Sequence, residues 1–79
     1  MKLSIYTLKE VLFEGEAEKI ITRTPLGEIT VLDGHLPIIS ILTGPTVKIV
    51  VKGGKEETVN VSSGFLEVRP QSEVVILAN

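Results

Sequence analysis

The chain has 79 residues, enough for one domain but too few for a second hydrophobic core. Its formal net charge is −2 and Lys and Arg are not clustered, which argues against nucleic acid as a partner. The absence of cysteine excludes disulfides and thiolate metal sites, and the single histidine argues against a histidine-rich metal site. We therefore expect no metal and no cofactor.

The composition favours strands and a location in the cytoplasm. Hydrophobic residues make up 43% of the chain and aromatic ones only 4%, with a mean hydropathy of +0.35, so Val, Ile and Leu form the core. No apolar run approaches the roughly 20 residues of a membrane-spanning helix, and Lys9 and Glu10 end the first apolar stretch too early for a signal peptide. This apolar content is high for so small a domain, so we expect a partner to cover part of it.

Alternating side chains predict strands in the first third of the chain. Lys2 to Leu8 forms a strand with Leu3 and Ile5 on one face. Residues 11 to 23 form a second, whose two faces alternate between small or apolar residues (Phe13, Gly15, Ala17, Ile21) and carboxylates (Glu14, Glu16, Glu18). The carboxylates form either a solvated face, which is the more common case, or a docking stripe for a basic partner.

The stretch Gly27–Pro37 combines a strand with a tight turn. Asp33-Gly34 permits positive φ, and Pro37 fixes the direction in which the backbone leaves. Glu28 and His35 therefore lie at opposite ends of a short strand. Glu28 is either an exposed carboxylate without a functional role or an interface contact. His35 either orders the turn by a hydrogen bond or acts as a ligand. No nucleophile accompanies them, so we expect no catalysis.

The next strand, Ile38 to Leu42, is apolar on both alternating faces, which predicts that both are covered. One face packs on the opposite sheet. The other is covered by a partner protein or by a loop of the chain itself.

Two hairpins complete the prediction. With Gly53-Gly54-Lys55 as the loop of the first, Ile49 opposes Val59 and Val47 opposes Val61. With Pro70-Gln71-Ser72 as the loop of the second, the opposed pairs are Val68 with Val74, Leu66 with Ile76 and Arg69 with Glu73. The other face of the second hairpin is also apolar, with Phe65, Val75 and Leu77.

The sequence has regularly spaced short strands and no stretch in which apolar residues recur with the period of a helix. This pattern indicates an all-β fold, a small sandwich or barrel spanning residues 1–79. No nucleophile elbow, phosphate-binding loop, dinucleotide fingerprint or zinc-protease motif occurs. An enzymatic role for this chain alone is not expected.

Four segments together resemble a known family. FEGEAEKI, GEITVLDGHLPIISIL, VNVSSGFLEV and the closing VVILA are similar to the N-terminal β-sandwich domain of the epsilon subunit of F-type ATP synthases, called delta in mitochondria. The resemblance implies a flattened β-sandwich of two mostly antiparallel sheets and a non-catalytic place in the rotor's central stalk. Its partners would be the gamma subunit and the c-ring of a proton- or sodium-driven enzyme. The chain would lie peripherally on the cytoplasmic face of the inner membrane, attached through the complex only.

The resemblance also implies contacts. Glu28 matches the carboxylate that approaches the c-ring loop, and Thr7, His35 and Ser40 match positions on or near the side facing gamma. The strand bounded by Ile38 and Leu42 is expected to dock on gamma as well.

The chain departs from the family pattern in two places. Gly44-Pro45 stands where the family commonly has Pro-Gly. The family usually continues into a two-helix C-terminal domain, whereas this sequence stops at Asn79, either because it is a piece of a longer protein or because the subunit is naturally short. The inhibitory and ATP-binding roles of that domain therefore do not carry over.

Two other classes compete with this interpretation. A lipoyl- or biotinyl-type carrier domain would use Lys52 or Lys55 at a hairpin tip, although the residues expected beside a carrier lysine are missing. A sugar-binding sandwich would need exposed aromatic platforms, which two Phe and one Tyr supply poorly.

Overall fold

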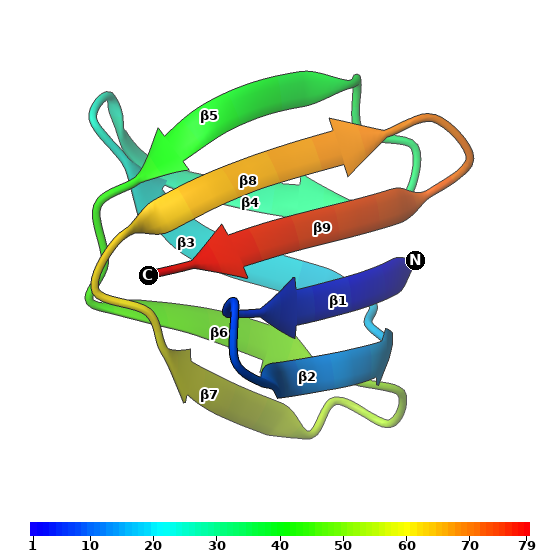
Figure 1. Cartoon of the computed structure of the whole chain (residues 1–79). Helices are drawn as coiled ribbons and strands as arrows, with labels where there is room; N and C mark the ends of the chain where they lie inside the picture. The colour runs from blue at the N-terminus through cyan, green and yellow to red at the C-terminus, as the bar shows by residue number, and fades with distance from the viewer.

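The computed structural model describes all 79 residues and contains nine β-strands and no helix. Its strands form two sheets that pack face to face; in Figure 1 the larger sheet lies toward the viewer. The strands are β1 (Lys2–Tyr6), β2 (Val11–Glu16), β3 (Lys19–Thr24), β4 (Gly27–Leu32), β5 (Ile38–Leu42), β6 (Thr46–Val50), β7 (Glu56–Asn60), β8 (Gly64–Arg69) and β9 (Glu73–Ala78). No segment has the helical length and apolarity needed to cross a membrane.

The two sheets confirm the expected all-β sandwich. The larger has the strand order β2-β1-β9-β8-β5 and the smaller has the order β4-β3-β6-β7. All neighbours are antiparallel except β1 and β9, which run parallel and so join the two ends of the chain in one sheet. The chain termini lie at opposite ends of the sheet in Figure 1 because β1 begins where β9 begins.

The core lies between the sheets. It is a single cluster of 15 buried hydrophobic residues, among which Leu3, Ile5, Ile20, Ile49, Leu66 and Ile76 are fully buried. Each such side chain stabilises the fold by roughly 1.5–3 kcal/mol relative to leaving it in water. No buried side-chain oxygen or nitrogen lacks a hydrogen-bond partner. The prediction that Leu3 and Ile5 share one face of the first strand is confirmed, and the structure shows that this face is the inner one.

The predicted single strand over residues 11 to 23 is wrong, because the chain changes sheets at Ala17–Glu18. The Ala17 N–H donates to the Met1 carbonyl at 2.8 Å, and the next N–H, of Glu18, donates to Val50 in the other sheet at 2.7 Å. The alternation restarts after this crossover, so Ile20 faces the core where Ile21 had been expected. The three carboxylates consequently do not form one stripe, since Glu18 lies beyond the end of β2.

The register predicted for the first hairpin is also wrong, by two residues. In the structure Val47 opposes Val59 and Ile49 opposes Glu57, and the connection runs over residues 51–55. The Val51 N–H donates to the Lys55 carbonyl at 2.9 Å and closes this longer loop. A shift of two residues leaves every side chain on its predicted face, so the hydrophobic pattern does not distinguish the two registers.

The second hairpin has the predicted register, with Val68 opposite Val74, Leu66 opposite Ile76 and Arg69 opposite Glu73. Gly64 begins this hairpin and allows a close approach between β8 and β9. A Cβ atom at Gly64 would clash with the Leu77 carbonyl oxygen, so only glycine fits here.

The stretch Gly27–Pro37 forms β4 and the turn that follows it. The His35 N–H donates to the Leu32 carbonyl at 3.1 Å, and Gly34 has φ +81°, which glycine adopts readily. Glu28 and His35 therefore lie at opposite ends of β4, as expected.

Candidate interaction surface

An unbroken row of apolar side chains crosses the outer face of the five-stranded sheet. The strand registers place these residues side by side, one from each strand: Ile41 of β5, Phe65 of β8, Leu77 of β9, Tyr6 of β1 and Val11 of β2. We call these five residues the outer row. At about 4.8 Å between strands, the row is about 19 Å long.

The outer row is exposed because the core is filled from the other side of the same strands. Ile41 is 54% exposed and Phe65 is 55% exposed, whereas their neighbours Leu42 and Leu66 are 1% and 0% exposed. The row therefore contributes little to the core. Single exposed apolar residues are common on proteins, but a continuous row of them is typical of a binding surface.

The next row along the strands is mixed. Ile39, Glu67 and Val75 lie side by side on β5, β8 and β9, with Ile39 77% exposed. A shallow hollow of about 310 Å³ lies between this row and the outer row. Side chains from both rows line it, so a partner residue could insert between them.

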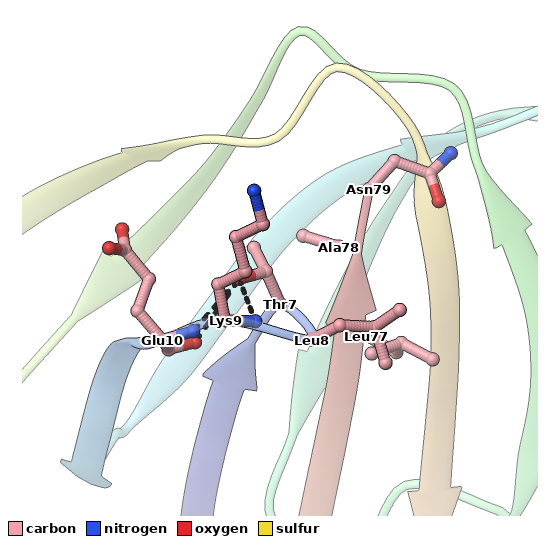
Figure 2. Close-up of a pocket in the computed structure, with 7 residues that line it drawn as sticks. All are labelled: Thr7, Leu8, Lys9, Glu10, Leu77, Ala78 and Asn79. Atoms are coloured by element: carbon pink, nitrogen blue, oxygen red, sulfur yellow. Dashed lines mark hydrogen bonds between the residues drawn. The ribbon is translucent and has the colours of Figure 1, made fainter.

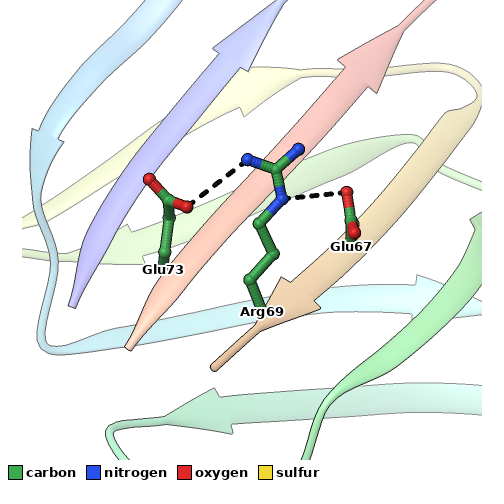
Figure 3. A network of polar contacts seen from close by, with 3 residues as sticks. All are labelled: Glu67, Arg69 and Glu73. Atoms are coloured by element: carbon green, nitrogen blue, oxygen red, sulfur yellow. Dashed lines mark hydrogen bonds and ion pairs between the residues drawn. The ribbon is translucent and has the colours of Figure 1, made fainter. Parts of the chain in front are cut away.

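The third row is charged. Figure 3 shows Arg69 between two carboxylates, with Nε 3.0 Å from Glu67 and a terminal guanidinium nitrogen 3.4 Å from Glu73. The hydrogen bond to Glu67, then that to Glu73, raises the pKa of Arg69 above its ordinary value. Lys2 of β1 lies beside Glu73 and continues the row. The outer face thus changes from apolar to charged toward the end that carries the N-terminus.

The structure corrects the side-chain assignment within β5. Leu42 is 1% exposed and belongs to the core, so its side chain does not lie on the free surface where a gamma contact had been expected. Ile38 is half-buried and packs against the core, and Ser40 on the same side is half-buried. The exposed side chains of this strand are Ile39 and Ile41, because alternate residues of a strand point to opposite faces.

Thr7 lies at the end of the outer row, in the turn between β1 and β2. Its hydroxyl oxygen accepts hydrogen bonds from the N–H groups of Lys9 and Glu10, both at 3.0 Å. This turn lines a hollow of about 550 Å³ whose other wall is residues 77–79. Figure 2 shows the residues that line it. Thr7 therefore fixes the turn, and Leu8 at its tip is 96% exposed.

His35 is half-buried in the loop between β4 and β5. Its Nδ1 lies 2.7 Å from the Leu36 carbonyl oxygen, and Leu36 itself is 77% exposed. The histidine thus has a local hydrogen bond, and an apolar side chain projects beside it.

Glu28 lies on the opposite outer face, that of the four-stranded sheet. It is exposed on β4 and paired across the ladder with Arg23 of β3. A small hollow of about 50 Å³ has Glu28, Arg23 and Lys48 in its lining. Leu26, at the tip of the adjoining turn, is 99% exposed. The structure therefore separates Glu28 from the outer row by the thickness of the sandwich.

Sequence reasoning identified Phe65 and Leu77 as surplus apolar residues but did not include Tyr6 or Val11. The alternation of Lys2 to Leu8 already placed Tyr6 opposite Leu3 and Ile5, so that signal was present. Val11 reaches the outer row only because a bulge between Ile5 and Tyr6 shifts the register with β2, and no sequence pattern marks that bulge.

No group of three or more His, Cys, Asp or Glu residues is placed to hold a metal.

Comparison with known proteins identifies the family. Residues 1–79 match the family described as the ATP synthase delta/epsilon chain, beta-sandwich domain. The chain belongs to this family. It is 41% identical over 78 residues to the ATP synthase epsilon chain of Shouchella clausii and 38% identical over 79 residues to that of Clostridium kluyveri. These matches leave the carrier-domain and sugar-binding alternatives without support.

Solved structures agree with the family. A chain of the Euglena gracilis mitochondrial ATP synthase, from a cryo-EM structure of OSCP/F1/c-ring, superposes with a TM-score of 0.87 at 29% identity and covers 96% of this chain. A chain from the central stalk and c-ring of the Tetrahymena thermophila mitochondrial ATP synthase gives a TM-score of 0.79 at 13% identity, which shows the shared fold.

The chain spans between about half and three-fifths of the length of the proteins that it matches. The matched residues are 99% of this chain but 57% of the Shouchella clausii protein, and 100% of this chain but 59% of the Clostridium kluyveri protein. The chain covers 48% of the Euglena gracilis chain and 61% of the Tetrahymena thermophila chain.

Proposed function

We propose that this chain acts as the β-sandwich of a central-stalk subunit in an F-type ATP synthase, where it joins the gamma subunit to the c-ring and performs no reaction itself. Membership of the delta/epsilon family supports this role. The structural observation that best supports this role is the outer row, an apolar surface that the chain leaves uncovered. The complex would be driven by protons or sodium ions, and the chain would reach the cytoplasmic face of the inner membrane through the complex only.

The outer row and β5 are the proposed gamma-binding surface. Ile39 and Ile41 project from the edge strand β5, where a partner can reach both the side chains and the unpaired strand edge. Ser40 lies on this edge strand between them, and His35 lies on the loop that leads into it. Thr7 fixes the turn at the far end of the row. The exposed side chains of Ile39 and Ile41 would make the main contact, whereas Ser40 and His35 would lie at its margin.

Glu28 is the proposed contact with the c-ring. It lies on the face opposite the outer row, so one domain can hold two neighbours without their competing for the same residues. Arg23 and Lys48 beside it give this surface a mixed charge, which suits the polar loops of a ring rather than an apolar partner.

The gamma assignment is tested by Ile41→Asp, with Leu32→Asp as the matched control. Leu32 is 51% exposed and Ile41 is 54% exposed, but they lie on opposite outer faces. Ile41→Asp should weaken binding to purified gamma by at least about tenfold, because a carboxylate must lose its water in an apolar contact. Leu32→Asp should leave binding unchanged. Equal binding by both variants, with the fold intact, would contradict the assignment.

The ring assignment is tested by Glu28→Arg against Thr30→Arg. Both residues are exposed on the same face of β4, two positions apart. Attachment of the gamma complex to isolated c-rings should fall only with Glu28→Arg, while gamma binding stays as in the parent chain. Loss of gamma binding with Glu28→Arg would mean that the two surfaces have been assigned to the wrong partners.

A further inference from the structure

The two sheets end in four edge strands, and β5 differs from the other three. β5 is the uppermost strand of the larger sheet in Figure 1, with no strand beyond it. An edge strand leaves backbone N–H and C=O groups unpaired, and proteins usually protect such an edge with charged side chains, proline or a bulge. β5 has no charged residue, and its ladder with β8 is unbroken from Ile38 to Leu42. The other three edge strands all carry carboxylates: Glu14 and Glu16 in β2, Glu28 in β4, and Glu56 and Glu57 in β7.

The hydrogen-bond pattern of the larger sheet shows which backbone groups of β5 are free. The Asn79 N–H donates at 3.1 Å to the carbonyl of Ser63, the residue opposite, so Ser63 bonds toward the β9 side. Bonded pairs alternate along an antiparallel ladder, so the residue after Ser63 bonds toward β5, where Leu42 lies opposite. The same alternation continues along β5. Ile39 and Ile41 therefore direct their N–H and C=O groups away from β8.

Contacts at the two ends of β5 limit the free edge to these two isoleucines. The Thr43 N–H, on the same side of the chain, donates to the Arg23 carbonyl of β3 at 3.1 Å. At the other end Pro37 has no N–H. The Ser40 hydroxyl donates to the Ile41 carbonyl at 3.1 Å, as expected for a carbonyl that β8 leaves free. A carbonyl has two lone pairs, so this one can accept a further hydrogen bond.

We propose that two copies of this chain pair through β5, antiparallel and centred on Ser40, and so close the free edge of the larger sheet. In this register Ile39 of each copy lies opposite Ile41 of the other, and opposite residues exchange both hydrogen bonds. A pair centred on Ile39 would place Ile41 opposite Pro37, which has no N–H to donate. A pair centred on Ile41 would place Ile39 opposite Thr43, whose N–H is already bonded within its own chain. Only the register centred on Ser40 uses every free group.

A second copy also suits this edge in charge. Ile39 and Ile41, which are 77% and 54% exposed, would cover each other on the outer face, and Ser40 would face Ser40 on the other side. No charges of like sign meet, whereas pairing two copies through β2 or β7 would bring carboxylates near one another. Two bonded residues per copy bury less than the roughly 1,200 Å² of a stable complex, so we expect a dissociation constant of about 0.1 mM.

The dimer does not rest on the function proposed above, although it uses the strand proposed for gamma. A gamma subunit and a second copy would compete for β5. Pairing between copies would cover the apolar edge of chains that are not yet assembled.

Sedimentation velocity of the parent chain between about 10 µM and 1 mM tests the dimer, because that range spans the expected dissociation constant. The sedimentation coefficient should rise with concentration and level off at the value of a dimer, since a two-fold pair is closed. Amide exchange at Ile39 and Ile41 should slow several-fold over the same range. Exchange at Val61, whose N–H is bonded to the Pro45 carbonyl, should not change.

Charged substitutions test the register. Ile39→Lys and Ile41→Glu should each weaken the dimer by about tenfold or more, because each places a charge against an isoleucine of the other copy. An equal mixture of the two variants should dimerise nearly as well as the parent, because the new lysine of one chain lies opposite the new glutamate of the other. A mixture of Ile39→Lys with Ile39→Glu is the matched control and should recover much less, since these positions are not opposite each other.

Three results would overturn the proposal. One is a folded parent chain that stays monomeric at about 1 mM, well above the expected dissociation constant. Another is a dimer that neither single substitution weakens, which would place the contact elsewhere. The third is growth beyond the dimer, which a closed pair does not allow. If circular dichroism shows that Ile41→Glu is unfolded, Ile39→Lys decides alone: a dimer as strong as that of the parent would refute pairing through β5.

Discussion

Ile41 and Leu42 are adjacent in β5 but should respond in opposite ways to truncation. Leu42 is 1% exposed, and Leu→Ala at such sites costs about 2–5 kcal/mol because it removes buried carbon and leaves a cavity. Ile41 is 54% exposed, so less than half of the roughly 1.5–3 kcal/mol of full burial is at stake. Ile41→Ala should therefore cost about 1 kcal/mol.

Urea unfolding measures this difference directly. A domain of this size has a total stability of roughly 4–12 kcal/mol and a urea slope near 1 kcal/mol per M. Leu42→Ala should lower the midpoint by about 2–5 M, or leave the chain unfolded in water, and Ile41→Ala by about 1 M. The ranking for gamma binding should be the reverse among folded chains, since only Ile41 lies in the outer row. A larger stability loss at Ile41 than at Leu42 would refute the assignment of the two faces.

Two further predictions concern the fold. Gly64→Ala should cost about 2 kcal/mol and lower the melting temperature by roughly 10 °C, because its Cβ would clash with the Leu77 carbonyl oxygen. An unchanged melting temperature would contradict this close approach. The pKa of Asp33 is lowered in the folded chain, so below about pH 4 the unfolded state binds more protons than the folded state. The stability that ionised Asp33 contributes is therefore lost as the pH falls through its pKa in the folded chain. Stability measured against pH should therefore fall less steeply in that acid range for Asp33→Asn than for the parent chain, and identical slopes would show that Asp33 is not coupled to folding.

Local pairing rules predicted the second hairpin because two independent patterns agreed on it. Val68 with Val74 on the inner face and Arg69 with Glu73 at the end require the same register. In the first hairpin, β7 is an edge strand whose side chains are mostly exposed, so few contacts select the register. Gly53 and Gly54, both with positive φ, also accommodate a longer loop than the predicted one.

The crossover at Ala17–Glu18 and the orientation of β5 depend on contacts far away in the sequence. No glycine or proline marks the crossover, and the partners that define it are Met1 and Val50. In β5, apolar residues occupy both alternating positions, so the sequence pattern left open which side faces the core. The ladder with β8 decides it, because Leu42 opposes Gly64 and Ile41 opposes Phe65.

The sequence predicted that the domain has an exposed apolar surface, but it did not predict which residues line up to form that surface. An excess of aliphatic residues predicted that the domain leaves apolar surface uncovered, and the exposed Ile39 and Phe65 agree with that expectation. The alignment of one side chain from each of five strands into a row follows from the order of the strands in the sheet. That order includes the parallel pairing of β1 with β9, which joins residues more than 70 positions apart and which no local pattern indicates.

The most direct test of the proposed gamma-binding surface is a methyl NMR titration of the chain, labelled at Ile, Leu and Val, with unlabelled gamma subunit. The methyl signals of Ile41, Leu77 and Val11 should shift or broaden together at the lowest gamma concentrations, while those of Leu32 on the opposite face stay unchanged. If the Leu32 signals respond first and the outer row does not, the apolar row is not where gamma binds.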